Sequence, residues 1–443
     1  MTQELHRLHA TADRALNLLL CAGGLLLTVS LSFAQHGPLR AGASRIEITP
    51  TLPVMLAGYE SRKELSRGVH DPLSARAVAF EQGSNHLVLV SIDNLGFYNA
   101  TAEPLRQAVL DACRLRPSEL FLCAIHTHSA PTLTLNPEKG HSNNVEYTKW
   151  LQGKLVEVVR SALERLAPAQ VGVGSGSSPV GANRREVVQD DTGKTKIVLG
   201  RNPSLLTDRE VQVLKITRTD RDELAGVLFA YSTHSTSLGP RNYLISGDVH
   251  GLAEQFLEKY LGAGVVTPGF AGASGNVDPW FRVLPGFNTT NGWIPEPVLL
   301  GTMLGEEVAQ VQSGMRKWST NGPIRTAIQN LDLPRKPNSE PLTSAAESPA
   351  SFVMTVGRVG DVAFVGLGGE AFNEIGLAIK KASPFPYTFV FTHCNGAAGY
   401  VPTSPSYPEG GYEVQSSAFA PGADDRLADE AKRMLTELRS AKD

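Results

Sequence analysis

HLVLVSIDNLGFYNATAEPLRQAVLDACRLRPSELFLCAIH, residues 86–126, contains two short apolar runs with an amphipathic segment between them. The runs LVLVSID (87–93) and LFLCAIH (120–126) have the length of buried strands. The segment AEPLRQAVLDACRL (102–115) has apolar residues at spacings of three and four, which is typical of a helix. The order strand, helix, strand predicts a unit in which the two strands run parallel.

The same alternation continues beyond this unit. A helix is predicted over YTKWLQGKLVEVVRSALERL (147–166), and DDRLADEAKRMLTELRS (424–440) predicts an amphipathic terminal helix. Residues 319–349 are polar and predict a long connection around one strand, IRTAIQNLDL (324–333). We therefore predict an α/β fold with a mixed, largely parallel sheet in layers, flanking helices, and no boundary that requires two domains.

Composition excludes one class of function. The chain has 443 residues, 42% of them hydrophobic, and a formal net charge of -3. This length supports a large core. Nucleic-acid binding needs a basic stripe, and the sequence has no long basic run. No protein partner is indicated either.

The N-terminus has the pattern of a secretory signal. Arg7 and Arg14 precede the apolar run ALNLLLCAGGLLLTVSLSFA (15–34), which ends on a small-x-small cleavage pattern. We expect a signal peptide over residues 1–34 and a secreted or periplasmic protein. The run is close to spanning length, so an uncleaved N-terminal membrane anchor is the alternative.

Removal of this segment leaves three cysteines, Cys113, Cys123 and Cys394. Three cysteines do not make a disulfide framework. Cys123 lies in an apolar run, which favours a buried small residue over a reactive thiol. The sequence leaves open whether Cys113 and Cys123 are bridged.

Six apolar runs end on side chains suited to chemistry. These side chains are Asp93 with Asn94, His126 with His128, His234, Asn276 with Asp278, Glu370, and His393 followed by Tyr400. In open α/β sheets, ligands gather outside the carboxyl ends of the strands. We therefore predict that these endings form a single site.

The pair His126 and His128 suggests a metal. Alternate residues of a strand point to the same face, so both imidazoles could face one cavity. Imidazole is a common zinc ligand, and a third histidine or a carboxylate completes a catalytic set. His234 and Glu370 are the best candidates for that completion. Each histidine alone is more typical of a hydrogen-bonded structural residue, and the set favours zinc.

Motifs in a fixed order resemble those of a known family. The motifs are SRGVHDPLSARA (66–77), AIHTHSAP (124–131), GANRRE (181–186), STHSTSLGPRNYLISGDVHG (232–251), GLGGEAF (366–372) and YVPTSPSYPEGGYEVQSS (400–417). Together they resemble the N-terminal catalytic domain of the neutral, non-lysosomal ceramidases, zinc amidases that cleave the N-acyl bond of ceramide. The resemblance runs from residue 41 to residue 422. It implies one ceramidase-like domain over 41–435, without the immunoglobulin-like C-terminal domain that the family usually carries.

The resemblance also implies roles for particular residues. It implies that zinc is held by His126, His234, Glu370 and Tyr400. His128 would lie beside the ligands or contact the substrate. Two further residues, Arg184 and Tyr412, would bind or polarise the substrate carbonyl. A lipid amide substrate implies in turn a transient contact with a membrane surface.

One position departs from the family pattern. The family carries Gly-Asp-Val-Ser-Pro-Asn with a nucleophilic serine, whereas this chain has GNVDP at 275–279, with Asp278 in the serine position. Our hypothesis is a zinc amidohydrolase that uses zinc-activated water, with Asp278 as proton acceptor or extra metal ligand. In the alternative, GNVDP is only a turn, and the protein is a zinc-bearing ligand-binding protein without catalysis.

Overall fold

The computed structural model describes residues 37–262, 264–280, 296–315, 323–337 and 351–441. The predicted signal peptide and much of the polar connection at 319–349 lie outside these described residues. None of the helices in the described ranges is long and apolar enough to cross a membrane. Residues Leu39–Asp443 form one compact unit.

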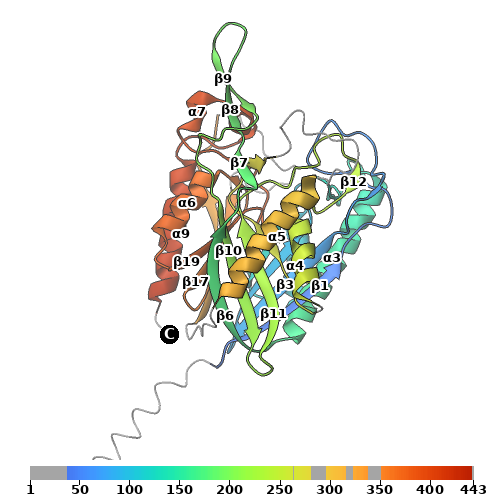
Figure 1. The fold of residues 1–443 in the computed structure, drawn as a ribbon, viewed down its shortest axis with the longest axis vertical. Coiled ribbons are helices and arrows are strands. Elements are labelled where there is room, and N and C mark those ends of the chain that lie inside the picture. Colours follow the sequence, from blue (N-terminus) through green and yellow to red (C-terminus); the bar gives the residue numbers. More distant parts are fainter. Residues whose placement is uncertain (1–36, 263, 281–295, 316–322, 338–350, 442–443) are drawn as a thin grey trace, which may run out of the picture. The chain divides into compact units, whose positions relative to one another are not determined.

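An eight-stranded mixed sheet is the centre of this unit (Figure 1). Its strands, in spatial order, are β13 (Gly269–Ala271), β11 (Glu223–Tyr231), β10 (Glu210–Arg218), β6 (Ala167–Ser177), β1 (Arg40–Glu47), β3 (Ser74–Gln82), β4 (Asn85–Ile92) and β5 (Leu120–Ala124). The predicted α/β class is confirmed. The predicted parallel unit is also present, because β4 and β5 pair in parallel across α2 (Ala102–Cys113).

The prediction of a largely parallel sheet is wrong. In this sheet only β4–β5 and β11–β13 are parallel among the described strands. The other neighbours are antiparallel. A tight turn at Gly83, whose φ is 61°, joins β3 directly to β4. Such short connections allow antiparallel pairing, whereas parallel strands need a crossover.

A second sheet packs against the first. Its strands, in spatial order, are β15 (Ile324–Asp332), β16 (Ser351–Val359), β17 (Val362–Leu367) and β19 (Tyr387–Phe391). Helices cover the outer face of each sheet. The large sheet carries α2, α3 (Ser142–Glu164), α4 (Asp248–Leu261) and α5 (Glu296–Gly314), and the small sheet carries α6 (Asn373–Ala382) and α9 (Ala423–Ser440). The order of layers is helix, sheet, sheet, helix.

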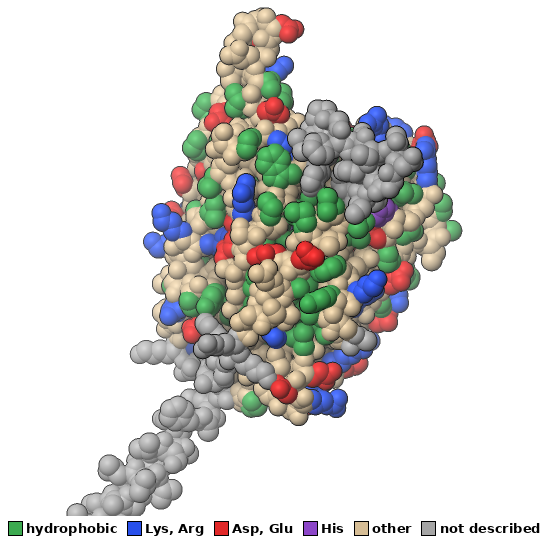
Figure 2. All heavy atoms as spheres, viewed as in Figure 1, with side chains coloured by type: hydrophobic (Ala, Val, Ile, Leu, Met, Phe, Trp, Pro, Cys, Tyr) green, Lys and Arg blue, Asp and Glu red, His purple; other side chains and the backbone are tan. Residues whose placement is uncertain are grey.

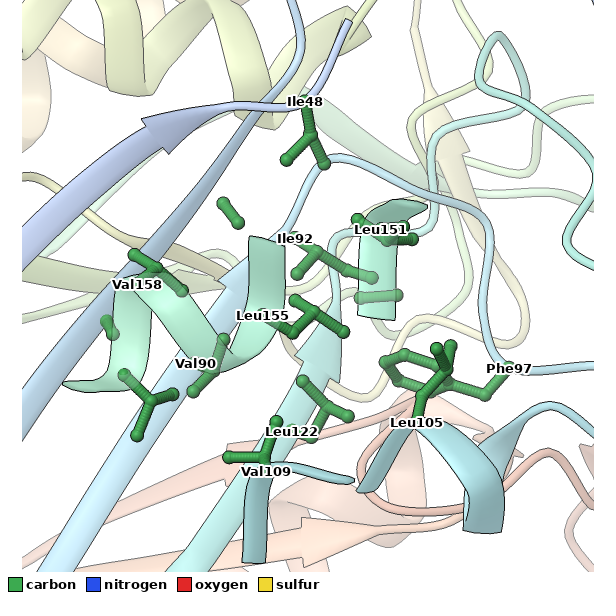
Figure 3. Close-up of a cluster of buried hydrophobic side chains, with 14 of the residues drawn as sticks. Ile48, Val90, Ile92, Phe97, Leu105, Val109, Leu122, Leu151, Leu155 and Val158 are labelled. Carbon is green, nitrogen blue, oxygen red and sulfur yellow. The ribbon is translucent and has the colours of Figure 1, made fainter. Parts of the chain in front are cut away.

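Strand β4 shows how the layers are held together. Val90 and Ile92 pack with Leu155 of α3 in the cluster drawn in Figure 3. The alternate side chains Leu87 and Leu89 face the second sheet. Burying each such side chain contributes about 1.5–3 kcal/mol relative to exposure. Because both faces of β4 are buried, its sequence is a continuous apolar run.

Short strands and helices surround the ends of these sheets. The short strand pairs are β2 (Gly68–Val69) with β12 (Leu244–Ile245), β7 (Gly181–Asn183) with β14 (Val277–Pro279), β8 (Arg185–Gln189) with β9 (Thr195–Leu199), and β18 (Glu370–Ala371) with β20 (Tyr400–Val401). The short helices are η1 (Pro117–Glu119), α7 (Ser406–Glu409) and α8 (Tyr412–Ser416). The β8–β9 hairpin projects from the main body at the top of Figure 1.

Residues Thr392–Asn395, directly after β19, connect both edges of the large sheet. The amide of Thr392 donates to the carbonyl of Ala271 in β13 at 2.9 Å. The amide of Asn395 donates to the carbonyl of Leu122 in β5 at 2.9 Å. This segment therefore fixes His393 next to the residues that follow β5.

Candidate active site

The two histidines of AIHTHSAP do not belong to the strand that precedes them. Strand β5 ends at Ala124, and His126 has a left-handed φ of 61°. The predicted strand alternation is therefore wrong in its local form, because a left-handed residue interrupts an extended chain. A single parallel bridge between Thr127 and Ser235 replaces it, and the amide of His128 donates to the carbonyl of Ser235 at 3.0 Å.

This bridge brings three imidazoles together. Ligand nitrogens of His126, His128 and His234 all lie within 4.8 Å of one another, and the three side chains are buried. The Nε2 atoms of His126 and His128 are 3.3 Å apart. Gly58, with φ 95°, lies against His128, where an added Cβ would be 2.3 Å from Nδ1. A glycine is therefore required at this position.

Backbone carbonyls set the orientation of two of the rings. The Nδ1 of His126 lies 2.7 Å from the carbonyl of Leu95. The Nδ1 of His234 lies 2.8 Å from the carbonyl of Ser274. A carbonyl only accepts, so each Nδ1 carries the proton, and in the neutral ring each Nε2 is an acceptor. Nε2 of His234 has a guanidinium nitrogen of Arg184 at 3.2 Å. Burial and the charge of Arg184 lower the pKa of His234, so this ring is neutral at pH 7.

The two Nε2 atoms face one carboxylate oxygen. Oε2 of Glu370 lies 3.4 Å from Nε2 of His126 and 3.6 Å from Nε2 of His234. The other oxygen, Oε1, accepts a 2.5 Å hydrogen bond from the hydroxyl of Tyr98.

The pairing of β18 with β20 brings a phenol to the same place. These strands are parallel, with Glu370 opposite Tyr400. The ladder therefore places the carboxylate and the phenol side by side, although the two residues lie in separate sequence motifs. Burial, and then the charge of Glu370, raises the pKa of Tyr400 well above its usual value.

This arrangement fits a bound cation. Oε2 of Glu370 is buried and makes no hydrogen bond. An unsatisfied buried carboxylate oxygen between two nitrogen lone pairs is costly, and a divalent ion at their common focus would satisfy all three atoms. Imidazole nitrogen and carboxylate oxygen are the donor types that zinc binds in catalytic sites. The residues present therefore fit the metal that the sequence implies.

Arg184 lies on the other side of His234. Its guanidinium donates to Oε1 of Glu413 at 2.7 Å, to Oδ1 of Asp278 at 3.1 Å and to the hydroxyl of Tyr400 at 3.1 Å. One of its nitrogens is also 3.2 Å from Nε2 of His234. Buried charges are retained where they are paired and hydrogen-bonded, so this cation is firmly positioned beside the candidate metal ligands.

Asp278 is buried in an ion pair. It lies on β14 opposite Ala182 of β7, which brings it next to Arg184. Its Oδ1 is 3.9 Å from Nδ1 of His234, the nitrogen that points away from Glu370. Arg201 approaches Oδ2 at 3.6 Å. The carboxylate is thus adjacent to the histidine cluster and held between two arginines.

Two aromatic rings define the edges of the cluster. The ring of Tyr412 meets that of Tyr400 at 5.7 Å, and Tyr412 is 48% exposed, so it lies at the surface beside the cluster. The ring of His393 stacks on His126 at 3.8 Å and 12°. His393 also has a left-handed φ, 53°. Unusual backbone conformations of this kind concentrate at functional sites.

The structure thus brings most of the predicted site residues together. The described cluster contains His126, His128, His234, Glu370, Tyr400, Arg184, Asp278 and Tyr412. Two residues of the predicted strand ends do not join it. Asp93 accepts from the amide of Ser74 at 2.7 Å and faces buried Arg76. Asn276 accepts from the amide of Asn373 at 2.9 Å.

Three residues that contact the cluster are absent from the sequence-based set. Tyr98 contacts Glu370, Glu413 contacts Arg184, and Arg201 contacts Asp278. Tyr98 follows the end of β4 by a few residues, and Glu413 follows Tyr412, so each lies next to a predicted position. Nearness in the sequence to a strand end or a motif is the only signal that could have indicated Tyr98 and Glu413.

The chain matches the profile of a known protein family. The profile of the family described as neutral/alkaline non-lysosomal ceramidase, N-terminal, matches residues 39–277, which is more than half of the chain. The chain belongs to this family. The matched segment includes His126, Arg184 and His234, and it ends one residue before Asp278.

Curated relatives match part of the chain. The neutral ceramidase of Mycobacterium tuberculosis is 27% identical over 223 residues, covering 47% of this chain and 33% of the relative. The neutral ceramidase of Pseudomonas aeruginosa is 27% identical over 285 residues, covering 59% of this chain and 40% of the relative. The aligned segments therefore span between a third and two fifths of these two relatives.

A solved structure matches the fold more completely. The crystal structure of the neutral ceramidase from Pseudomonas aeruginosa superposes with a TM-score of 0.75 at 20% identity, covering 91% of this chain and 74% of that chain. A structure described as ceramidase complexed with C2 gives a TM-score of 0.74 at 18% identity, covering 91% of this chain and 75% of that chain. The α/β layers of this protein are therefore those of the ceramidase fold.

Proposed function

We propose that this ceramidase-family protein is a zinc-dependent amidohydrolase that cleaves the N-acyl bond of a ceramide-like lipid or a related acylated amine. The observation that carries the proposal is the buried Oε2 of Glu370, which has no hydrogen bond and lies 3.4 and 3.6 Å from the Nε2 atoms of His126 and His234. Membership of the ceramidase family supports the reaction class.

The metal would be held by His126, His234, Glu370 and Tyr400. When bound, zinc lowers the pKa of a coordinated water and polarises a carbonyl oxygen. Binding at His234 requires that Nε2 give up its contact with Arg184. This frees one N–H of the guanidinium for the substrate.

The protein side chains supply positioning and charge. Arg184 is fixed by Glu413 and Tyr400, so its freed N–H can donate to the carbonyl oxygen as negative charge develops there. Tyr412, at the surface beside the cluster, would orient the same carbonyl. Asp278, which is paired with Arg184 and Arg201, would accept the proton of the attacking water. His128 lies beside the ligands and lines the reaction space.

Exposed apolar side chains near Tyr412 support a lipid substrate. Tyr412 lies on α8, and the preceding Gly411 contacts Ile197 of strand β9. The β8–β9 hairpin exposes Val187 by 55% and Leu199 by 39%. Figure 2 shows hydrophobic side chains among charged ones on the side of the molecule that faces the viewer, with the hairpin at the top. We propose that the hairpin makes transient contact with a membrane surface and that the protein works after export.

A substrate screen tests the function. N-acyl sphingosines and short N-acyl amino compounds would be incubated with the purified protein, before and after treatment with a chelator, and the free fatty acid measured. We expect hydrolysis of the long-chain lipids, loss of activity with the chelator and recovery on adding zinc. Protein that binds zinc and N-acyl lipid but releases no fatty acid would instead be the binding protein without catalysis. Protein that carries no stoichiometric metal would contradict both alternatives.

Tyr98→Phe tests the metal site without changing any of the proposed metal ligands. The change removes the donor to Oε1 of Glu370 and leaves a buried oxygen unsatisfied. Loss of such a supporting contact weakens metal affinity by about 10–100-fold, which competition with a chromogenic chelator would measure. The matched control is Tyr147→Phe, because the Tyr147 hydroxyl donates to the carbonyl of Ile48 instead. Equal zinc affinity in both variants would contradict the prediction.

A further inference from the structure

Two cysteines that are distant in the sequence face each other beside the candidate site. Cys123 of β5 and Cys394 pair as an isolated antiparallel bridge. The flanking hydrogen bonds run from the amide of Ala124 to the carbonyl of His393 at 3.3 Å, and from the amide of Asn395 to the carbonyl of Leu122 at 2.9 Å. The cysteines themselves exchange no backbone hydrogen bond, so they form the closer of the two kinds of antiparallel pair.

This type of pair has the spacing of a disulfide. Residues opposite each other at a non-hydrogen-bonded position have Cα atoms about 4.5 Å apart, with their side chains close together. Disulfides occur at Cα separations of about 4.4–6.8 Å. A bond between Cys123 and Cys394 therefore requires no large movement of the backbone.

The surroundings of the pair leave space for it. Both cysteines are buried, in the apolar layer between the two sheets. Sγ of Cys394 lies over Gly366, where an added Cβ would come within 2.4 Å of the sulfur. The third cysteine is elsewhere, because Sγ of Cys113 lies 4.0 Å from the carbonyl of Val156. All three cysteines are free thiols in this structure, and the one that faces Cys123 is Cys394.

We propose that Cys123 and Cys394 form an intramolecular disulfide when the chain folds in the presence of a thiol-disulfide oxidant. The thiolate of one cysteine attacks the disulfide of the oxidant and forms a mixed disulfide. The second thiolate then displaces the oxidant thiol and closes the protein bond. The two cysteines give up two electrons and two protons, and both pass to the two sulfurs of the oxidant, which leaves as its dithiol or as two thiols.

The Cys123–Cys394 disulfide would form while the chain folds and not after folding is complete. Both thiols are buried, and burial followed by the neighbouring Cys394 thiol raises the pKa of Cys123 well above its usual value. A buried thiol with little thiolate exchanges slowly. The reduced, folded protein is thus expected to resist oxidation until it is unfolded.

The disulfide would hold together the two segments that carry His126 and His393. It would join β5, which leads to His126, to the segment that carries His393, and these two rings stack at 3.8 Å. The residues that this pairing brings together are far apart in the chain, since Leu122 and Asn395 are separated by 273 positions. Closing so long a loop removes much chain entropy from the unfolded state.

Oxidative refolding tests the proposal. The full chain would be unfolded and reduced, then refolded with reduced and oxidised glutathione, alkylated in denaturant and mapped as peptides without reduction. We expect a Cys123–Cys394 linked peptide, an alkylated Cys113, and a Tm about 5 °C or more above that of protein refolded with reductant. Alkylation of both Cys123 and Cys394, or a bridge that contains Cys113, would overturn the proposal.

Variants separate the bond from general effects of the oxidant. Cys113→Ala is expected to keep the difference in Tm between the oxidised and the reduced protein, because Cys113 is outside the pair. The double variant Cys123→Ala, Cys394→Ala is expected to lose that difference. If the double variant does not fold, the peptide map of the unaltered chain decides the question. An equal difference in Tm in the double variant would also overturn the proposal.

Discussion

Glu370→Gln is expected to abolish stoichiometric zinc binding and to reduce hydrolysis of an N-acyl lipid by about 10³-fold or more. The reason is the position of Oε2, which lies between Nε2 of His126 and Nε2 of His234 without a hydrogen bond. A neutral amide gives up the negative charge that helps to attract a cation. It can also turn its NH₂ group towards Nε2 of His126 and satisfy that lone pair without any metal.

Glu370→Gln should not lower the Tm of the metal-free protein, although it prevents stabilisation by zinc. Because the amide can donate where the carboxylate oxygen has no partner, the metal-free variant should melt no lower than the metal-free unaltered protein. Zinc should raise the Tm of the unaltered protein, since a ligand that binds only the native state stabilises it, and should leave the variant unchanged. Calorimetry with and without zinc, together with metal analysis after dialysis, measures both effects.

Glu374→Gln is the matched control for this experiment. Glu374 is a nearby carboxylate on α6 that accepts from Asn276 at 2.9 Å and does not contact the histidines. This variant should keep its zinc and its hydrolytic rate. Retention of stoichiometric zinc by Glu370→Gln, as in Glu374→Gln, would show that the metal is bound elsewhere.

The sequence predicts the elements of this fold better than their arrangement. The apolar runs at β4 and β5 and the helical spacing at α2 are local properties, and all three elements form within a few residues of the predicted bounds. Strand direction is not local. It depends on connections such as the turn at Gly83, so the sheet is mainly antiparallel although its first recognisable unit is parallel.

The same distinction applies to the candidate site. His126, His234 and Glu370 could be predicted because chemically active side chains at strand ends tend to meet. Tyr98 was not predicted, because it lies in the loop after β4 and its contact with Glu370 depends on the tertiary structure. Asp93 also ends a strand, but its carboxylate faces Arg76 in a buried ion pair. Only the tertiary structure decides which strand-end carboxylates neutralise an arginine and which face the histidines.

Asp278→Asn is expected to lower kcat by about 10²–10⁴-fold while zinc remains bound, as for the loss of a general base. Asparagine keeps the size of the side chain and can still accept from Arg184, which is 3.1 Å from Oδ1. It cannot accept a proton. Metal analysis and steady-state kinetics on the same preparation would separate the loss of rate from loss of metal.

The control for Asp278→Asn is another buried ion pair that lies away from the histidines. Asp208 pairs with Lys380 at 2.6 Å, and Asp208→Asn should reduce the free energy of unfolding with little change in kcat. Arg184 keeps Glu413 as a partner in the Asp278 variant, so the guanidinium retains one of its two carboxylates. A large loss of rate in Asp278→Asn but not in Asp208→Asn would therefore come from the chemistry of the site. Equal rates in Asp278→Asn and the unaltered protein would exclude Asp278 as the proton acceptor and leave its ion pair with Arg184 as its role.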